Sequence, residues 1–302
     1  MQTREPPLEW RMGDAGGFIE LPTGGRIAFD EYGDPSGVPV MFLHGWPSSR
    51  SMARLTDAAA KRTGVRIISP DRPGIRDSSF QPNRKLLDWP KVSRALLAHL
   101  GLKRVRLLAI SGGAPYAYAA AWANPDQIEV AAVVSGAPPI AELEERAGLL
   151  RLYRWMLALH SSEPELLRTL FRVVRPFAAT RVPLRLRPLL LRTLQRNDAE
   201  VLRDAEAFEA CFESSRQAWR GSVEGVIADA EIYATSWGFR LEEVAVPMRL
   251  WHGTNDRAFS PHLAEETGKR LPDCTLRIVP DAGHYSLPIR HMGEILRDLL
   301  RA

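Results

Sequence analysis

The chain contains 302 residues, of which 45% are hydrophobic and 25% are charged, and this ordinary globular composition excludes a disordered or fibrous protein. Its formal charge of +4 arises from 40 basic and 36 acidic residues, an excess too small to indicate a nucleic-acid partner. No apolar run reaches the roughly 18 residues that a membrane span needs.

The polar N-terminal segment MQTREPPLEWRMGDAGG lacks the apolar core of a secretion signal. We therefore expect a cytoplasmic protein. Cys211 and Cys274 form neither a disulfide framework nor a metal-ligand spacing, which predicts two free thiols. We expect neither a metal ion nor a cofactor.

Short apolar segments rich in β-branched residues recur along the chain and predict strands. The first two, residues 17–21 and 26–32, are separated by the turn sequence PTGG and predict an antiparallel hairpin at a sheet edge. The later segments alternate with helical patterns such as residues 86–100 and 261–271. This alternation predicts an α/β fold with a mostly parallel, doubly wound sheet. The later strands are expected at residues 38–44, 64–69, 104–110, 128–134, 246–251 and 274–279.

The alternation stops between residues 140 and 237. This stretch contains leucine- and arginine-rich helical patterns punctuated by prolines, and it contains no convincing strand. It predicts a helical insertion, here named the cap, over residues 140–237. The core then consists of residues 1–139 and 238–302. Because no low-complexity linker separates the two parts, we expect the cap to pack on the core.

Charge is unevenly distributed within the cap. Residues 146–197 contain eleven arginines and two glutamates, whereas residues 198–231 contain nine acidic residues and three arginines. We expect the two blocks to face each other or solvent, although the arginines could also bind an acidic or amphiphilic substrate. A stripe at helical spacing is more often packing between helices than the wall of a pocket, although its aromatic and methionine side chains could also line an apolar acyl site. The stripe consists of Leu149, Leu152, Trp155, Met156 and Leu159.

Polar residues follow the predicted strands at the points where each strand ends. They are His44, Asp71, Ser111, Asp256 and His284. Because the carboxyl ends of parallel strands share one edge of an open sheet, where ligands bind, we expect these side chains to converge.

Ser111 lies where an apolar strand turns directly into an alanine-rich helix, in the sequence LLAISGGAPYAYAA. Such a sharp turn forces the serine into a strained backbone conformation and requires small residues two positions away on each side. Ala109 and Gly113 satisfy that requirement, and Gly112 leaves the approach to the hydroxyl open. The pattern predicts a nucleophilic serine.

A serine hydroxyl needs a base, and the base needs an orienting partner. His284, on a glycine-containing loop after the last strand, is the predicted base. Asp256 follows the preceding strand, 28 residues upstream, and is the predicted partner in an adjacent loop. Asp281 is the competing carboxylate, but it lies only three residues from His284 and is expected to shape that loop.

The order Ser111, Asp256, His284, together with the motifs HGWP at residues 44–47 and DRPG at residues 71–74, resembles the α/β-hydrolase-fold serine hydrolases. The resemblance runs from about residue 18 to the C-terminus. It implies that the insertion is the family's variable helical cap. It further implies an oxyanion hole formed by the backbone N–H groups of Trp46 and Gly112.

The sequence departs from the family pattern at two positions. Ala109 replaces the commonest residue of the nucleophile motif, glycine, and this change is small enough to do little harm. Arg76 stands where the family often has glycine, after the tight turn that begins at residue 71.

The resemblance implies hydrolysis of a small or medium carboxylic ester through an acyl-enzyme on Ser111. The expected partner is a small-molecule substrate, with no nucleic acid and no stable membrane insertion. Two alternatives on the same fold remain open: a lyase of the hydroxynitrile type, which uses a similar triad without an acyl-enzyme, and a receptor that binds a small molecule. Hydrolysis of simple aryl esters with acylation of Ser111 separates an esterase from a binding protein, and release of cyanide or a ketone from hydroxynitriles indicates a lyase.

Overall fold

The computed structural model describes residues 16–22 and 24–301. Most of the N-terminal segment on which the cytoplasmic location was predicted, and the first fifteen residues of the predicted core, lie outside this part of the chain. Among the described residues, no helix is both long and apolar enough to cross a bilayer. Cys211 and Cys274 are free thiols, as predicted.

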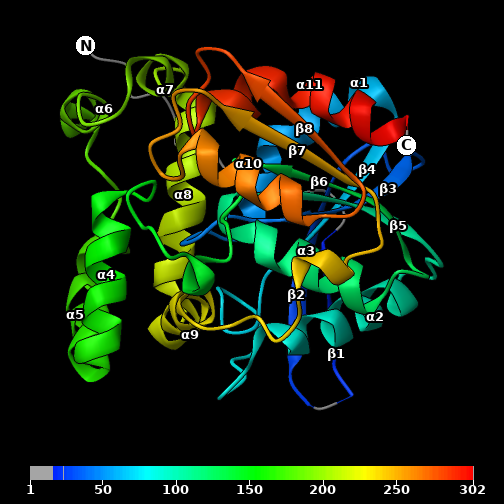
Figure 1. Ribbon diagram of the computed structural model, residues 1–302, viewed down its shortest axis with the longest axis horizontal. Helices are drawn as coiled ribbons and strands as arrows, with labels where there is room; N and C mark the ends of the chain where they lie inside the picture. The colour runs from blue at the N-terminus through cyan, green and yellow to red at the C-terminus, as the bar shows by residue number, and fades with distance from the viewer. Residues whose placement is uncertain (1–15, 23, 302) are drawn as a thin grey trace, which may run out of the picture.

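Eight strands form one sheet in the order β1-β2-β4-β3-β5-β6-β7-β8, shown in Figure 1. The strands β1 and β2 form the predicted antiparallel hairpin at one edge. β2 also pairs antiparallel with β4, and all later pairs are parallel. The strand bounds are β1 (Gly17–Glu20), β2 (Arg26–Gly33), β3 (Val38–Leu43), β4 (Val65–Pro70), β5 (Val105–Ile110), β6 (Ile128–Val134), β7 (Met248–Gly253) and β8 (Cys274–Val279).

Helices cover both faces of the sheet, because side chains alternate between the faces along each strand. In β3, Met41 and Leu43 pack in the cluster that contains side chains of α2, α3 and α10. Val40 and Phe42 point the other way, into the cluster that contains side chains of α1 and α11. This confirms the predicted doubly wound sheet. The helix bounds are α1 (Asp57–Thr63), α2 (Trp89–His99), α3 (Ala114–Ala123), α10 (Pro261–Arg270) and α11 (Ser286–Leu300).

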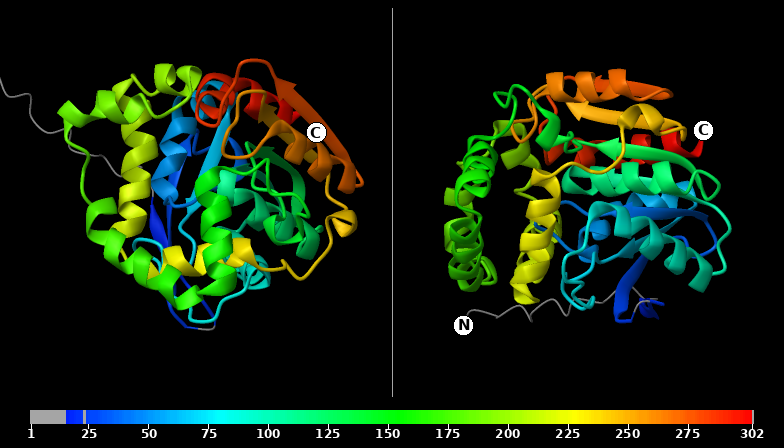
Figure 2. Two further views of the ribbon diagram at one scale, coloured as in Figure 1. Left: turned by 60° about the vertical axis from the view of Figure 1, so that its left-hand side comes forward. Right: turned by 60° about the horizontal axis from the view of Figure 1, so that its bottom comes forward.

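The cap helices all lie between β6 and β7 in the chain, which confirms an inserted helical cap. In Figures 1 and 2, α8 and α9 lie between the sheet core and the α4–α5 pair. The bounds are α4 (Arg151–Ser162), α5 (Pro164–Ala178), α6 (Arg187–Leu191), α7 (Arg196–Val201), α8 (Ala205–Arg220) and α9 (Val223–Ala234). Short 3₁₀ turns occur at η1 (Arg50–Thr56), η2 (Leu86–Asp88), η3 (Ser111–Gly113), η4 (Ile140–Glu142), η5 (Leu184–Leu186) and η6 (Leu241–Glu243).

The two charge blocks of the cap face each other, as expected. Three ion pairs join the arginine-rich block to α8 and α9: Arg168–Glu231 at 2.6 Å, Arg172–Glu224 at 3.0 Å and Arg181–Glu209 at 3.0 Å. Pairs of this kind at a partly exposed surface each contribute at most about 1 kcal/mol. They orient the helices, while most of the stability of the cap comes from its apolar contacts.

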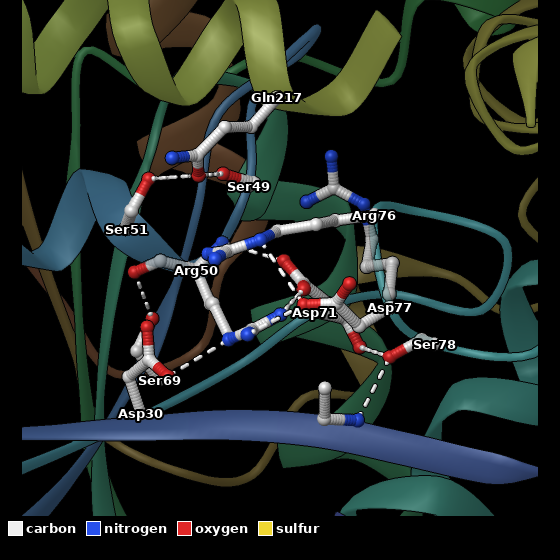
Figure 3. Close-up of polar contacts among 12 residues, drawn as sticks. Asp30, Ser49, Arg50, Ser51, Ser69, Asp71, Arg76, Asp77, Ser78 and Gln217 are labelled. Atoms are coloured by element: carbon white, nitrogen blue, oxygen red, sulfur yellow. Dashed lines mark hydrogen bonds and ion pairs between the residues drawn. The ribbon is translucent and has the colours of Figure 1, made fainter. Parts of the chain in front are cut away.

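The cap is attached to the segment that follows β3. Figure 3 shows Gln217 of α8 facing Ser49 and Ser51, whose hydroxyls donate to its amide oxygen at 3.1 and 2.7 Å. Below them the guanidinium of Arg50 is buried and pairs with a group of carboxylates. These are Asp30, Asp71 and Asp77. The cluster ties β2, the loop after β4 and η1 together beneath the cap.

Candidate active site

Ser111 lies in a strained turn at the end of β5. Its φ of +53° places it in the left-handed region, which costs a residue other than glycine of order 1 kcal/mol or more. A Cβ at Gly113 would lie 2.1 Å from the carbonyl oxygen of Leu43, so only glycine fits there. The turn therefore has the conformation that the sequence predicted, and α3 begins directly after it.

Ser111, His284 and Asp256 lie in a hydrogen-bonded row. The Nε2 atom of His284 is 3.0 Å from the Oγ atom of Ser111, and its Nδ1 atom is 2.8 Å from Oδ2 of Asp256. The other oxygen of Asp256 accepts the backbone N–H groups of Ala258 and Phe259 at 2.8 and 3.1 Å. These two bonds hold the carboxylate with Oδ2 directed at the histidine.

Asp281 does not occupy the place of Asp256. Its backbone N–H donates to Oγ1 of Thr254 at 2.9 Å, and its φ is +56°. Within residues 24–301, Asp256 is the carboxylate on the ring of His284. Asp281 shapes the loop, as the sequence analysis expected.

Two of the strand-end residues do not converge with the other three. The ring of His44 is fully buried; its Nδ1 donates to the carbonyl oxygen of Gly45 at 3.0 Å, and its Nε2 accepts the N–H of Arg72 at 3.4 Å. Burial and the nearby charge of Arg72 hold the pKa of His44 well below its usual value. Asp71 pairs with Arg50 (Figure 3). Both side chains are engaged by other partners: His44 contacts Gly45 and Arg72, and Asp71 pairs with the buried Arg50 of η1, so neither is hydrogen-bonded to Ser111.

Burial lowers the pKa of His284, but the charge and hydrogen bond of Asp256 and the charge of Asp198 outweigh it. The net pKa of His284 lies above the ordinary 6.5. Burial raises the pKa of Asp256, whereas His284 and the neighbouring hydrogen bonds lower it, so that the net pKa lies below 3.8. The carboxylate is therefore ionised at neutral pH and can stabilise a positive charge on the imidazole.

Trp46 and Gly112, the two residues predicted to form an oxyanion hole, lie beside Ser111. A Cβ at Gly112 would lie 3.1 Å from the backbone nitrogen of Trp46, so the two residues touch. Gly112 lies at the start of the helical segment, where N–H groups lack intrahelical partners. Within the described chain, the N–H of Trp46 has no hydrogen-bond acceptor. This pair of donors is suited to a developing oxyanion.

Hydrogen bonds to the neighbouring carbonyl groups fix the direction of both donors, because the C=O and N–H of a trans peptide point opposite ways. The Nη2 atom of Arg72 donates to the carbonyl oxygen of Gly45 at 2.8 Å, which orients the N–H of Trp46. The N–H of Ala137 donates to the carbonyl oxygen of Ser111 at 3.0 Å, which orients the N–H of Gly112.

Asp198, in α7 of the cap, contacts the loop that carries His284 and was not predicted from the sequence. Its buried carboxylate accepts the backbone N–H groups of His284 at 3.1 Å, Tyr285 at 3.1 Å and Ser286 at 2.8 Å. A Cβ at Gly283 would lie 2.5 Å from this carboxylate. Asp198 thus caps the first turn of α11 and holds the loop that carries His284. The local signal is the glycine at position 283, which leaves room for a side chain from elsewhere.

Two cavities of unequal size meet at Ser111. The smaller, here named the slot, has a volume of about 60 Å³. The larger, here named the chamber, has a volume of about 600 Å³. Trp46, Ser111 and Tyr153 line both. The slot is mainly apolar and includes Met156, Leu157, Leu167, Phe171 and Ile227. The chamber is more polar and includes Arg192, Arg257, His284 and Tyr285.

The profile of a family described as "Alpha/beta hydrolase family" matches residues 40–298. The chain is 24% identical over 270 residues to the uncharacterized hydrolase YcgS of Bacillus subtilis (strain 168), a match that covers 86% of this chain and 89% of that protein. It is 29% identical over 125 residues to a non-heme haloperoxidase of Rhodococcus erythropolis, and this match spans 41% of the chain and only 45% of the haloperoxidase.

The fold is similar to that of a thermophilic esterase from Thermogutta terrifontis. The superposition has a TM-score of 0.67 at 20% sequence identity, and it covers 95% of this chain and 98% of the esterase. At this level of identity the likeness shows a shared fold.

Proposed function

The chain belongs to the alpha/beta hydrolase family, and on that premise we propose that it hydrolyses carboxylic esters through an acyl-enzyme on Ser111. The observation that carries this proposal is the hydrogen-bonded row of Ser111, His284 and Asp256, with Ser111 Oγ 3.0 Å from His284 Nε2. The likeness to an esterase supports an ester as the scissile group. No described residue has to move far for the first proton transfer.

In the proposed mechanism, Oγ of Ser111 attacks the ester carbonyl carbon while its proton passes to Nε2 of His284. The carbonyl oxygen becomes an oxyanion that accepts hydrogen bonds from the backbone N–H groups of Trp46 and Gly112. Asp256 stabilises the imidazolium that forms. The tetrahedral intermediate then collapses; the C–O bond to the alcohol breaks, and His284 returns the proton to the leaving oxygen.

Deacylation uses the same groups in reverse. A water molecule gives a proton to Nε2 of His284 and attacks the acyl carbon. The oxyanion that forms again accepts hydrogen bonds from the N–H groups of Trp46 and Gly112. When this intermediate collapses, the proton returns to Oγ of Ser111 and the carboxylic acid is released.

The two cavities suggest which part of the ester lies where. Because His284 protonates the leaving oxygen, the alcohol part lies on the side of that ring. His284 lines the chamber and does not line the slot. We therefore place the acyl group in the slot and the alcohol in the chamber. The slot volume of about 60 Å³ favours short acyl groups.

We further propose that the cap, residues 140–237, selects the acyl group while the triad lies in the core, residues 1–139 and 238–302. Side chains from α4, α5 and α9 form much of the slot. An apolar wall disfavours a charged acyl group, since an unpaired charge is costly to desolvate.

The test combines a fluorophosphonate probe with aryl esters of graded acyl length. Wild-type protein should be labelled on Ser111, and short-chain esters should be hydrolysed fastest. Ser111→Ala should abolish both labelling and turnover. Ser135→Ala is the matched control, because Ser135 is also buried after a strand and has a φ of +49°; it should remain fully labelled.

Two results would overturn the proposal. Release of cyanide from a hydroxynitrile, without labelling of Ser111 by the probe or hydrolysis of any ester, would indicate the lyase. Saturable binding of small molecules without labelling or turnover would indicate a receptor.

A further inference from the structure

We propose that the chamber binds an anionic group on the alcohol part of the ester, and that Arg192 and Arg257 bind it. The substrate class is then an ester of a short apolar acid with a carboxylate-bearing alcohol. This inference rests on the proposed ester hydrolysis at Ser111 and on the placement of the alcohol in the chamber.

Arg192 and Arg257 reach the chamber from different parts of the fold. Arg192 lies between α6 and α7 of the cap, and Arg257 directly follows Asp256 in the loop after β7. One of these lining residues thus belongs to the cap and the other to the core. An anion between them would be contacted from both sides.

Within the described residues, neither guanidinium has a carboxylate within ion-pair distance. Arg257 lies against the side chain of Gln195, whose amide oxygen, when turned toward it, accepts from Nη2 at 2.7 Å, from Nη1 at 3.0 Å and from Nε. By contrast, Arg168 and Arg172, which belong to the same arginine-rich block as Arg192, are paired with glutamates of α9. Among the described residues, Arg192 and Arg257 therefore differ from the arginines that hold the cap together, because Arg192 has no ion-pair partner and Arg257 contacts an uncharged amide.

The carboxylate groups beside the chamber already accept hydrogen bonds from other parts of the protein. The carboxylate of Asp198 accepts three backbone N–H groups at the start of α11, and Asp256 is bound to His284. The residues that line the chamber include two arginines, Arg192 and Arg257, against one carboxylate, Asp198, so their formal charge with His284 neutral is positive. A guanidinium can bind a carboxylate through two parallel N–H···O bonds.

The slot offers no comparable charge. Its one arginine, Arg168, is paired with Glu231 at 2.6 Å, and the remaining wall is mainly apolar. An anionic group should consequently be accepted on the alcohol side and rejected on the acyl side.

The test compares two esters that share the butyryl group, para-carboxyphenyl butyrate and para-carbamoylphenyl butyrate. The measured quantity is the ratio of their kcat/KM values, anionic over neutral, in wild type, Arg192→Gln and Arg257→Gln. Comparing the ratio between proteins cancels the intrinsic reactivity of the two leaving groups. Since both arginines are exposed to solvent, each substitution should lower the ratio about 3- to 10-fold.

Arg185→Gln is the matched control. It removes the same charge from an exposed arginine of η5 that lines neither the slot nor the chamber, and it should leave the ratio unchanged. Added salt should lower the wild-type ratio, because the contacts are solvent-accessible. The monophenyl ester of succinic acid, with its charge on the acyl side, should be a poor substrate for all four proteins.

The outcomes separate the two proposals. If Ser111 is labelled and both butyrates are hydrolysed, but neither substitution changes the ratio, the anion site is wrong and the ester hydrolase stands. A ratio that falls equally in Arg185→Gln would also reject the site, because it would reflect general charge. If neither ester is hydrolysed and Ser111 is not labelled, the proposed function fails and the anion site fails with it.

Discussion

His284 lies between two carboxylates, with Asp256 on its ring and Asp198 on its backbone N–H. Burial lowers the pKa of this histidine, but both negative charges raise it, and the net pKa is above 6.5. The base acts in its neutral form, so kcat/KM for a neutral ester should rise as the pH rises through a midpoint above 6.5.

The pH–rate profile of wild-type protein measures that midpoint. Asp256→Asn should move it to lower pH and reduce kcat by about 10⁴-fold, since the ring loses its orienting partner. A wild-type midpoint below 6.5 would contradict the assignment of His284 as the base that Asp256 supports.

Asp198→Ala should leave three N–H groups at the start of α11 without an acceptor. Displacement of the His284 loop should then lower kcat by about 100-fold, and the free energy of unfolding should fall by about 1–3 kcal/mol. The midpoint of the pH–rate profile should also fall, because the negative charge of Asp198 raises the pKa of His284. That shift distinguishes positioning of the base from a loss of stability alone.

Glu200→Ala is the control for this prediction. Glu200 lies on the same helix, α7, and pairs at 3.1 Å with Arg290, and both side chains are exposed. Its loss should cost less than about 1 kcal/mol and leave kcat unchanged. Equal effects of the two substitutions would reject the positioning role of Asp198.

The contrast between the triad and Asp198 shows which residues a sequence can predict. Ser111, Asp256 and His284 each follow a strand, and the geometry of a parallel sheet brings strand ends together. Asp198 is separated from His284 by 86 residues, and its role depends on how a cap helix docks on the core. No local pattern encodes that docking, apart from the glycine that makes room for it.

At the scale of elements, one buried carboxylate of α9 connects the cap to the loop after β3 that contains Gly45 and Trp46. Asp229 accepts hydrogen bonds from Arg72 and Tyr116, both at 2.7 Å, and also pairs with Arg84. Arg72 in turn donates to the carbonyl oxygen of Gly45. The cap helix thus supports the peptide that carries the N–H of Trp46.

Asp229→Ala should lower the free energy of unfolding by about 3–5 kcal/mol, because two guanidinium groups are left buried without their partner. Urea denaturation measures this change. The control is Glu224→Ala on the same helix, which breaks an exposed pair with Arg172 and should cost less than about 1 kcal/mol. Similar losses of unfolding free energy in both variants would contradict the prediction that Asp229 stabilises the fold through its buried ion pairs.

The same carboxylate makes a contribution to stability that depends on pH. Burial raises the pKa of Asp229, but Arg72, Arg84 and the hydrogen bond from Tyr116 outweigh it, and the pKa falls from 3.8 to about 2. A lowered carboxyl pKa stabilises the folded state above the unfolded value. The contribution of Asp229 is therefore fully present above about pH 4 and lost as the pH falls through about 2.

The accuracy of the sequence predictions also differs between elements. The segment 128–134 is predicted as a strand and forms β6 with the same bounds, because a buried parallel strand is apolar at nearly every position, here at all but Glu129. In the cap, the stripe on α4 favours packing, yet Leu152 and Trp155 are 54% and 52% exposed. Met156 lines the slot, which is the alternative that the sequence left open. Helical spacing identifies a face but does not tell what covers it.

At the scale of the whole molecule, the proposed placement of the acyl group in the slot makes the shape of the cap decide which acyl groups are accepted. Leu167→Ala on α5 should enlarge a cavity of about 60 Å³ and admit longer chains. The octanoate-to-acetate ratio of kcat/KM should rise at least about tenfold, as methylene discrimination in apolar pockets suggests. Labelling of Ser111 by a small probe should change much less.

Leu152→Ala is the matched control, since this leucine lies on α4 outside the slot. It should leave the order of the esters unchanged. If Leu167→Ala also left that order unchanged, the cap would not be the selector of the acyl group.

The contact of Asp198 with the loop before α11 limits how this enzyme can diverge or be recombined. A chimera in which residues 140–237 were exchanged for the cap of a relative would lose Asp198 and keep Gly283, so three N–H groups would face an empty space. A transplanted cap would have to bring its own acceptor to that position. Under the proposed function, such an exchange would replace the residues that select the acyl group together with the carboxylate that holds the His284 loop, although Ser111, Asp256 and His284 lie outside the exchanged segment.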